Sequence, residues 1–311
     1  MASRLRSTQK LMGGAGLTLA LLVLIFFEPS RALGFDAAPG GPRAEAFLLF
    51  RLINEARVAP KKTLEQLGID VEEARRAMGD DAWVLDVSLP PLSWKPALFE
   101  AAERHGLDMI DGVFYDHRGR DGSLVADRVQ DVGYEAVLVE ELLGLLSVLT
   151  FVDGPEAAWI LFEQWVRDEV SPSRPFGGLV LFNPLLTQIG VSLQPAAVVL
   201  DGGSPVNVYV AVAVVARPTQ KEPMVVGNLL SQDGLWGLDG GQPGGAWVVV
   251  CRDAHERTLW TGPADPWGGY QCPLPEGYAV VEVVDPAVPT TVLRVVLRGI
   301  DENLWADIVL P

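Results

Sequence analysis

Apolar residues in the first half of the chain recur at helical spacing, with polar residues between them. Two of these stretches begin with acidic residues at the spacing of a capping box, Asp70 with Glu73 and Asp153 with Glu156. The first residue of each pair precedes the helix, and the second lies in its first turn. An acidic N-cap accepts hydrogen bonds from the first free amides of a helix. The pattern therefore predicts helices at about 44–57, 71–78, 96–110 and 155–170.

Later runs are apolar at nearly every position and rich in β-branched residues. This composition is found at 188–193 and 206–215, and it is typical of strands that are buried on both faces. Helices that surround such strands predict a layered α/β domain.

The pattern changes after a polar stretch that is bracketed by prolines, which we interpret as a linker at 218–223. Helical spacing is almost absent beyond it, and short β-rich runs are separated by clusters of Gly, Pro and Asp. We expect a small all-β sandwich over 224–311, and thus an α+β chain. The predicted strands lie at 224–230, 246–251, 279–284 and 291–297.

The first ten residues carry three basic side chains and no acidic one, and an apolar run follows from Leu11 to Phe27. Small residues at Ser30 and Ala32 then favour a signal peptide, 1–32, that is cleaved after Ala32. An uncleaved anchor is the alternative, because the run approaches the roughly 17 to 25 residues that cross a bilayer. Both readings predict a secreted or cell-envelope protein that meets the membrane only through this segment, if it is retained.

Acidic residues outnumber basic ones by 40 to 24. This balance argues against nucleic acid and anionic membrane surfaces as partners. Cys251 and Cys272 lie close together in a chain that is expected to enter an oxidising compartment, so we expect a disulfide between them.

Four segments of the first domain resemble the ordered motifs of one family. Leu92 to Met109 resembles "L-x-W-x-x-x-L-x-x-A-A-x-x-H-x-x-D-M", and Tyr115 to Val129 resembles "S-H-x-x-x-D-G-x-x-x-x-D-R". Gly133 to Glu141 has the spacing of "G-Y-x-x-x-x-x-x-E-N", and Asn183 to Val191 resembles "N-P-x-x-T-x-I-G-V". Together they are similar to the CAP superfamily of cysteine-rich secretory, antigen 5 and pathogenesis-related proteins, in its bacterial SCP-like branch.

The resemblance covers residues 45–217 and implies an α-β-α sandwich whose cleft holds two histidines and acidic residues that can take a divalent metal. His117 matches the first histidine and Glu141 the cleft glutamate, with Glu140 as the alternative if the register slips by one. The second histidine is missing, because Arg174 or Gly177 takes its place, depending on the anchor of the alignment. We therefore expect no two-histidine metal site and no cofactor.

Several charged residues of this domain also have simpler interpretations. His105 lies on an apolar-periodic helix and is expected to be packed and hydrogen-bonded. Glu141 and its neighbour Glu140 could equally be a solvated helix start. Glu163 and Glu169 are expected to be surface charges. Arg174 could pair with Glu141 or offer a fork to an anionic ligand, and a surface arginine is the favoured interpretation.

The second domain resembles the carboxypeptidase regulatory-like, or prealbumin-like, β-sandwich. The resemblance rests on Gly268 to Val283, which is similar to "G-G-Y-x-x-x-L-P-x-G-x-Y-x-V". It implies a spacer or adhesion module in which the Cys251–Cys272 bond links two strands. The stretch 231–241 is similar to a calcium-binding turn but has too few oxygen ligands, so we expect an ordinary turn.

These features predict an exported SCP-like protein with a degenerate cleft that binds a small apolar or glycan ligand, or another surface protein. The alternative is a hydrolase without metal, in which His117 is the base and Glu141 the acid or the orienting group. A purely structural component of the envelope is a third possibility.

Overall fold

The computed structural model describes residues 42–148, 152–173, 178–199, 203–230, 247–285, 292–299 and 302–310. All of them belong to one compact unit. The predicted signal or anchor segment, the positions Arg174 and Gly177 and the turn at 231–241 lie outside the described residues. None of the described helices combines the length and the apolarity that are needed to cross a membrane.

A four-stranded sheet forms the centre of the first part of the chain, in the order β1-β3-β4-β2. β4 pairs antiparallel with both β2 and β3, and β1 joins the edge of β3 in parallel. The strands are β1 (Ser93–Trp94), β2 (Ala136–Val148), β3 (Gln188–Val199) and β4 (Pro205–Pro218). The sequence predicted β3 and β4 and missed the other two.

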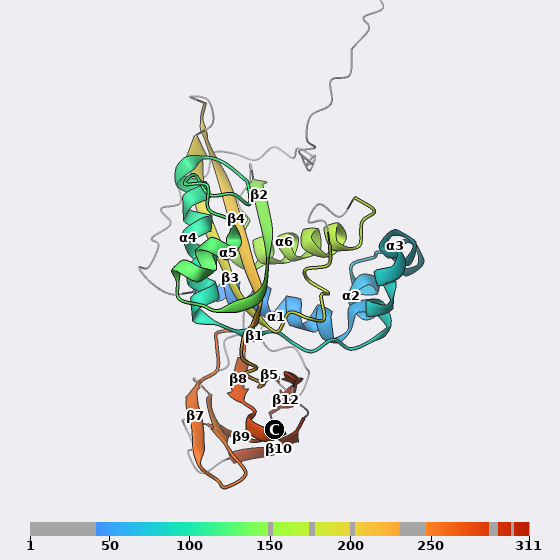
Figure 1. Cartoon of the computed structure of the whole chain (residues 1–311), viewed down its shortest axis with the longest axis vertical. Coiled ribbons are helices and arrows are strands. Elements are labelled where there is room, and N and C mark those ends of the chain that lie inside the picture. The colour runs from blue at the N-terminus through green and yellow to red at the C-terminus, as the bar shows by residue number, and fades with distance from the viewer. Residues whose placement is uncertain are drawn as a thin grey trace, which may run out of the picture. The chain divides into compact units, whose positions relative to one another are not determined.

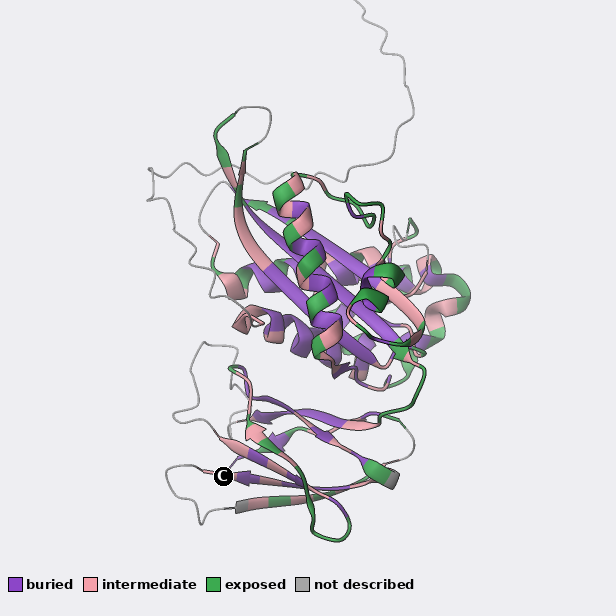
Figure 2. Ribbon diagram, turned by 60° about the vertical axis from the view of Figure 1, so that its left-hand side comes forward, coloured by how far each residue is buried: buried purple, intermediate pink, exposed green. Residues whose placement is uncertain are grey.

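β4 has an apolar core on each of its faces, because successive side chains of a strand point to opposite sides. Tyr209, Ala211, Ala213 and Val215 belong to one core, and Val208, Val210, Val212 and Val214 belong to the other. Figure 2 shows these buried strands between helices. The near-continuous apolarity of the segment follows from this double burial.

Helices cover both faces of this sheet (Figure 1). The predicted α-β-α layers are therefore present. The first core includes residues of α1 (Ala44–Val58), α2 (Pro60–Gln66), α3 (Val71–Met78), a 3-10 helix (Gly79–Asp86) and α6 (Gly154–Glu169). The second includes residues of α4 (Pro96–Gly112) and α5 (Val125–Asp131).

Two helices begin where their acidic N-caps predicted. Asp70 Oδ1 accepts a hydrogen bond from the amide of Glu73, and Asp153 Oδ1 accepts one from Glu156, both at 2.8 Å. Each carboxylate satisfies an amide that has no partner within its helix. These bonds fix the starts of α3 and α6.

Trp165 of α6 packs closely against the sheet. It is fully buried, and its indole Nε1 donates to the carbonyl of Leu143 at 2.8 Å. The strands make room for the indole with small residues, since a Cβ added to Gly144 would lie 3.2 Å from Trp165 Nε1 and 3.4 Å from the Cβ of Ala211. Gly144 and Ala211 are partners in the β2–β4 ladder.

Two further sheets form the second part of the chain and share an apolar core, as the predicted β-sandwich requires. One has the order β10-β9-β6-β7, and in the other β5 pairs with β8, β11 and β12. The strands are β5 (Met224–Leu230), β6 (Val248–Arg252), β7 (Thr258–Pro263), β8 (Gly269–Pro273), β9 (Tyr278–Val284), β10 (Val292–Arg298), β11 (Leu304–Trp305) and β12 (Ile308–Val309).

The predicted disulfide is present between Cys251 of β6 and Cys272 of β8, with 5.7 Å between the two Cα atoms. Since β6 and β8 belong to different sheets, the bond joins the two layers of the sandwich. Both cysteines are fully buried in its core.

Hydrogen bonds connect the residues on either side of the predicted linker at 218–223. Asn303 Nδ2 donates to the carbonyls of Pro91 and Thr187, at 2.9 and 2.7 Å. The side chain of Gln271 both accepts from the amide of Trp94 and donates to its carbonyl. Since all of these residues belong to one compact unit, the boundary at 218–223 stays a prediction.

Candidate functional site

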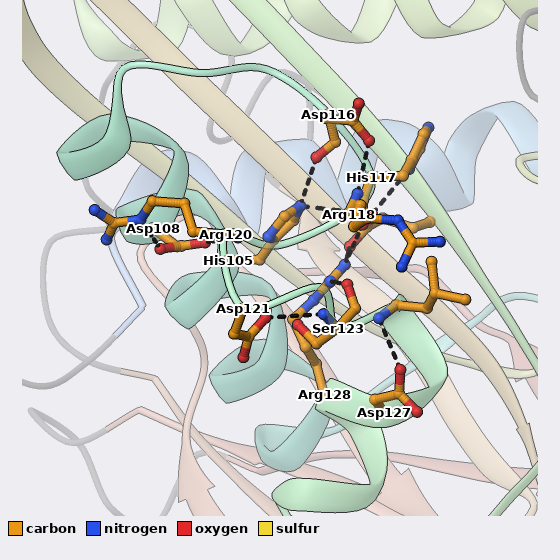
Figure 3. Close-up of polar contacts among 12 residues, drawn as sticks. His105, Asp108, Asp116, His117, Arg118, Arg120, Asp121, Ser123, Asp127 and Arg128 are labelled. Carbon is orange, nitrogen blue, oxygen red and sulfur yellow. Dashed lines mark hydrogen bonds and ion pairs between the residues drawn. The ribbon is translucent and has the colours of Figure 1, made fainter.

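His117 lies in the loop between α4 and α5, and local hydrogen bonds fix the shape of this loop. The amide of Gly119 donates to the carbonyl of Ser123 at 2.9 Å, and Asp121 Oδ1 accepts from the amide of Ser123 at 2.8 Å. Arg120 forms an ion pair with Asp108 of α4 at 2.6 Å. The loop therefore holds His117 at a defined position beside the sheet (Figure 3).

Glu141 on β2 lies between an exposed histidine and a buried arginine. His117 Nδ1 donates to Glu141 Oε2 at 2.9 Å, and Arg128 Nη2 donates to Glu141 Oε1 at 2.7 Å. Glu141 is 4% exposed, whereas the side chain of His117 is 48% exposed. The result is a chain of three linked groups, which we call the His117 triad: His117, Glu141 and Arg128.

The triad corrects one sequence interpretation of Glu141. The residue lies within strand β2 and not at a solvated helix start, and its carboxylate is buried. A buried carboxylate needs a countercharge and hydrogen-bond donors, which Arg128 and His117 supply.

Arg128 of α5 is the member of the triad that the sequence interpretation missed. Besides its bond to Glu141, Nη2 donates to the carbonyl of His117 at 3.1 Å and Nη1 donates to the carbonyl of Ser123 at 3.0 Å. The "D-R" end of the loop motif contained this arginine without a role. A buried acid in a cleft needs a cation beside it, and this requirement could have identified Arg128 from the sequence.

His105 of α4 is packed and hydrogen-bonded, as predicted. It is 1% exposed, and its Nε2 donates to the carbonyl of Asp116 at 2.9 Å. Burial lowers the pKa of His105, although the negative charge of Glu141 opposes this effect. His105 Nε2 is also 3.9 Å from Glu141 Oε2, so the buried imidazole lies behind the triad.

Other acidic groups lie near the triad. Burial raises the pKa of Glu140, and the nearby His117 opposes this shift. Burial also raises the pKa of Asp168 on α6. The pKa of Tyr115, two residues before His117, is raised by burial and by the charges of Asp168 and Glu141. Asp168 was not a sequence candidate.

The two glutamates of α6 that were expected at the surface differ from each other. The side chain of Glu163 is 42% exposed and pairs with Arg167 at 2.7 Å, as expected for a charge at the surface. The prediction for Glu169 is wrong, because this residue is fully buried. Its Oε1 accepts from the amides of Val180 and Phe182, at 2.8 and 2.9 Å, and these two bonds compensate the lost hydration.

No family model and no curated protein matches the sequence. Among solved structures, an extracellular protein with an SCP domain from Bacillus anthracis matches at 20% identity and a TM-score of 0.29. The match covers 50% of this chain and 43% of that protein, so the chain spans less than half of its length. An outer surface protein of Borrelia burgdorferi matches at 15% identity and a TM-score of 0.30, over 48% of this chain and 90% of that one.

The chain's own layers and the order of its motifs agree with the sequence resemblance. The histidine loop precedes the glutamate strand, and the sheet lies between two helical layers. The first part of the chain therefore has the α-β-α layers that the sequence resemblance implies.

The residues around the His117 triad do not fit a two-histidine metal site. Both oxygens of Glu141 already accept hydrogen bonds, and His105 is buried with its Nε2 bonded to a backbone carbonyl. Within the described ranges, no three His, Cys, Asp or Glu side chains come together as metal ligands would. The triad instead presents one exposed imidazole on a buried ionic support.

Proposed function

We propose that this chain is an exported SCP-like protein that binds a component of the cell envelope through the surface around His117, without catalysing a reaction. One observation carries the proposal. Of the three linked groups of the triad, only His117 is exposed, while Glu141 is buried with both oxygens engaged. Glu141 therefore supports the imidazole and does not itself reach a ligand.

A fixed imidazole is suited to recognition. It presents the flat face of its ring at a set position, and it loses little conformational freedom when a ligand binds. The acidic composition and the expected export favour a glycan, a small apolar molecule or another surface protein as the ligand.

Export is supported by the apolar segment near the N-terminus and by the disulfide, which persists in oxidising compartments. Sequencing the N-terminus of the mature protein tests this part. A new terminus at Leu33 supports a cleaved signal peptide. An intact Met1 in a membrane fraction would replace cleavage with anchoring.

Cosedimentation with isolated cell envelopes tests binding. We expect His117→Ala to reduce the retained fraction, because it removes the exposed member of the triad. The matched control is His255→Ala, which removes an imidazole from the turn between β6 and β7 and is expected to leave retention unchanged. Equal retention of both variants would refute recognition through His117.

A hydrolase is the second candidate, and the 2.9 Å contact between His117 and Glu141 favours it. A carboxylate at Nδ1 orients an imidazole that acts as a general base toward water. Such a base contributes about 10²–10⁴-fold to a rate. A search with ester and amide substrates therefore separates the two functions: hydrolysis that falls at least about 100-fold in His117→Ala would replace the binding proposal.

A further inference from the structure

A polar cavity of about 440 Å³ lies between α4, the following loop and α5. Its lining consists of three arginines, three aspartates, one histidine and one serine. Figure 3 shows the side chains of His105, Asp108, Arg120, Asp121 and Arg128 in this region. His117 is not among the lining residues, so the cavity adjoins the exposed imidazole without including it.

Two buried atoms of the lining have no hydrogen-bond partner, Nδ1 of His105 and Nε of Arg128. The two residues are 1% and 9% exposed. Buried polar atoms are nearly always hydrogen-bonded. Arg128 Nε is a donor, and His105 Nδ1 is an acceptor in the neutral ring, because Nε2 carries the proton that Asp116 O accepts. The lining residues thus include an unsatisfied donor and an unsatisfied acceptor just beneath the cavity surface.

The charges of the lining exclude an anion as the best occupant. Each arginine is already paired with a carboxylate: Arg104 with Glu100, Arg120 with Asp108 and Arg128 with Glu141. No positive charge is left in excess for phosphate or sulfate, since two further aspartates also line the cavity.

A metal ion and an apolar molecule fit the lining no better. No group of metal-ligating side chains is assembled among the described residues, and all eight lining residues are polar or charged. An apolar ligand would bury these charges without hydrogen bonds, which is costly. A neutral ligand with many donors and acceptors remains.

We propose that the cavity binds a neutral polyhydroxylated ligand, a mono- or oligosaccharide. Each hydroxyl group can accept from an arginine and donate to an aspartate. The volume lies within the range of about 300–1,000 Å³ that is common for small-molecule sites. The inference rests on the proposed binding function, because it names the ligand class and places the ligand beside the triad.

Calorimetric titration of the full-length protein with glucose and with N-acetylglucosamine tests the proposal. We expect saturable binding that Arg104→Ala weakens about tenfold, since it removes a charged donor from the wall. The matched control is Arg167→Ala. Like Arg104, Arg167 is an exposed helical arginine that pairs with a glutamate four residues earlier, but it does not line the cavity.

Nitrogen NMR of the histidine rings gives a second readout. Sugar binding is expected to shift the ring nitrogen signals of His105, because this residue lines the cavity and its surroundings change. Binding that His117→Ala abolishes while Arg104→Ala leaves it intact would overturn the cavity as the site. Absence of sugar binding would overturn the inference alone, since retention on cell envelopes that depends on His117 would leave the proposed function standing.

Discussion

Replacement of Arg128 by methionine removes the cation that supports the His117 triad. The substitution deletes the 2.7 Å bond to Glu141 and the bonds to the carbonyls of His117 and Ser123. Methionine is flexible enough to fill much of the same volume, so the change acts mainly on charge and hydrogen bonding.

The magnitude follows from the burial of both partners. Arg128 is 9% exposed and Glu141 4%. Breaking a buried ion pair by removing one partner costs about 3–5 kcal/mol, because the other charge stays buried without compensation. An exposed pair contributes only about 0.2–1 kcal/mol. We therefore expect Arg128→Met to lower the free energy of unfolding by about 3–5 kcal/mol.

Urea denaturation followed by circular dichroism measures this difference. Arg104→Met is the control, since it breaks the exposed pair with Glu100. Glu141→Met and the double variant Arg128→Met/Glu141→Met complete a mutant cycle that isolates the coupling between the two charges. The double variant is expected to be more stable than Arg128→Met alone, because it leaves no unpaired carboxylate.

A loss below about 1 kcal/mol for Arg128→Met, similar to that of Arg104→Met, would refute this reasoning. A mutant cycle that gives no coupling energy between Arg128 and Glu141 would refute it as well. Either result would mean that Glu141 is hydrated in solution and that Arg128 does not hold it.

Three more predictions concern stability. Serine in place of Cys251 is expected to cost about 3 kcal/mol, because the bond closes a loop of 21 residues. The melting temperature should fall by about as much as reduction lowers that of the parent, and an unchanged melting temperature would contradict this. Gly190→Ala should lower the free energy of unfolding in urea by at least about 1–3 kcal/mol, since a Cβ there would lie 1.9 Å from the amide nitrogen of Phe99. Gly178→Ala is the control, because a Cβ at that position would meet open space. Below about pH 6.5 the unfolded chain binds a proton more readily than buried His105 does, so stability should fall as the pH drops below this value. His105→Gln should flatten this fall in the urea midpoint, and equal slopes would contradict it.

The sequence predicted the elements whose patterns reflect local physics. Helices α3 and α6 begin at their acidic caps, and β4 lies where apolar residues are continuous. Strand β2 was missed because Glu140 and Glu141 interrupt its apolar run. The buried place of Glu141 makes sense only with Arg128 and His117, which come from other parts of the chain.

The sequence predicted part of the candidate site. The structure brings together His117 and Glu141, the pair that the resemblance implied, whereas Arg128 remained an unassigned motif residue. Glu169 was misjudged because its partners are backbone amides more than ten residues further along the chain. No side-chain pattern records such amides, so a lone charge on an amphipathic helix is indistinguishable from a surface charge.

The two apolar faces of β4 have a consequence for insertions and deletions. In a strand with one wet face, a shift by one residue exposes apolar side chains, and polarity alone fixes the register. A shift by one residue in β4 would exchange one apolar face for the other, and it would expose no apolar side chain to water and bury no polar one. Volume must fix its register instead, since a valine would then replace Ala211 beside Gly144 and the indole of Trp165.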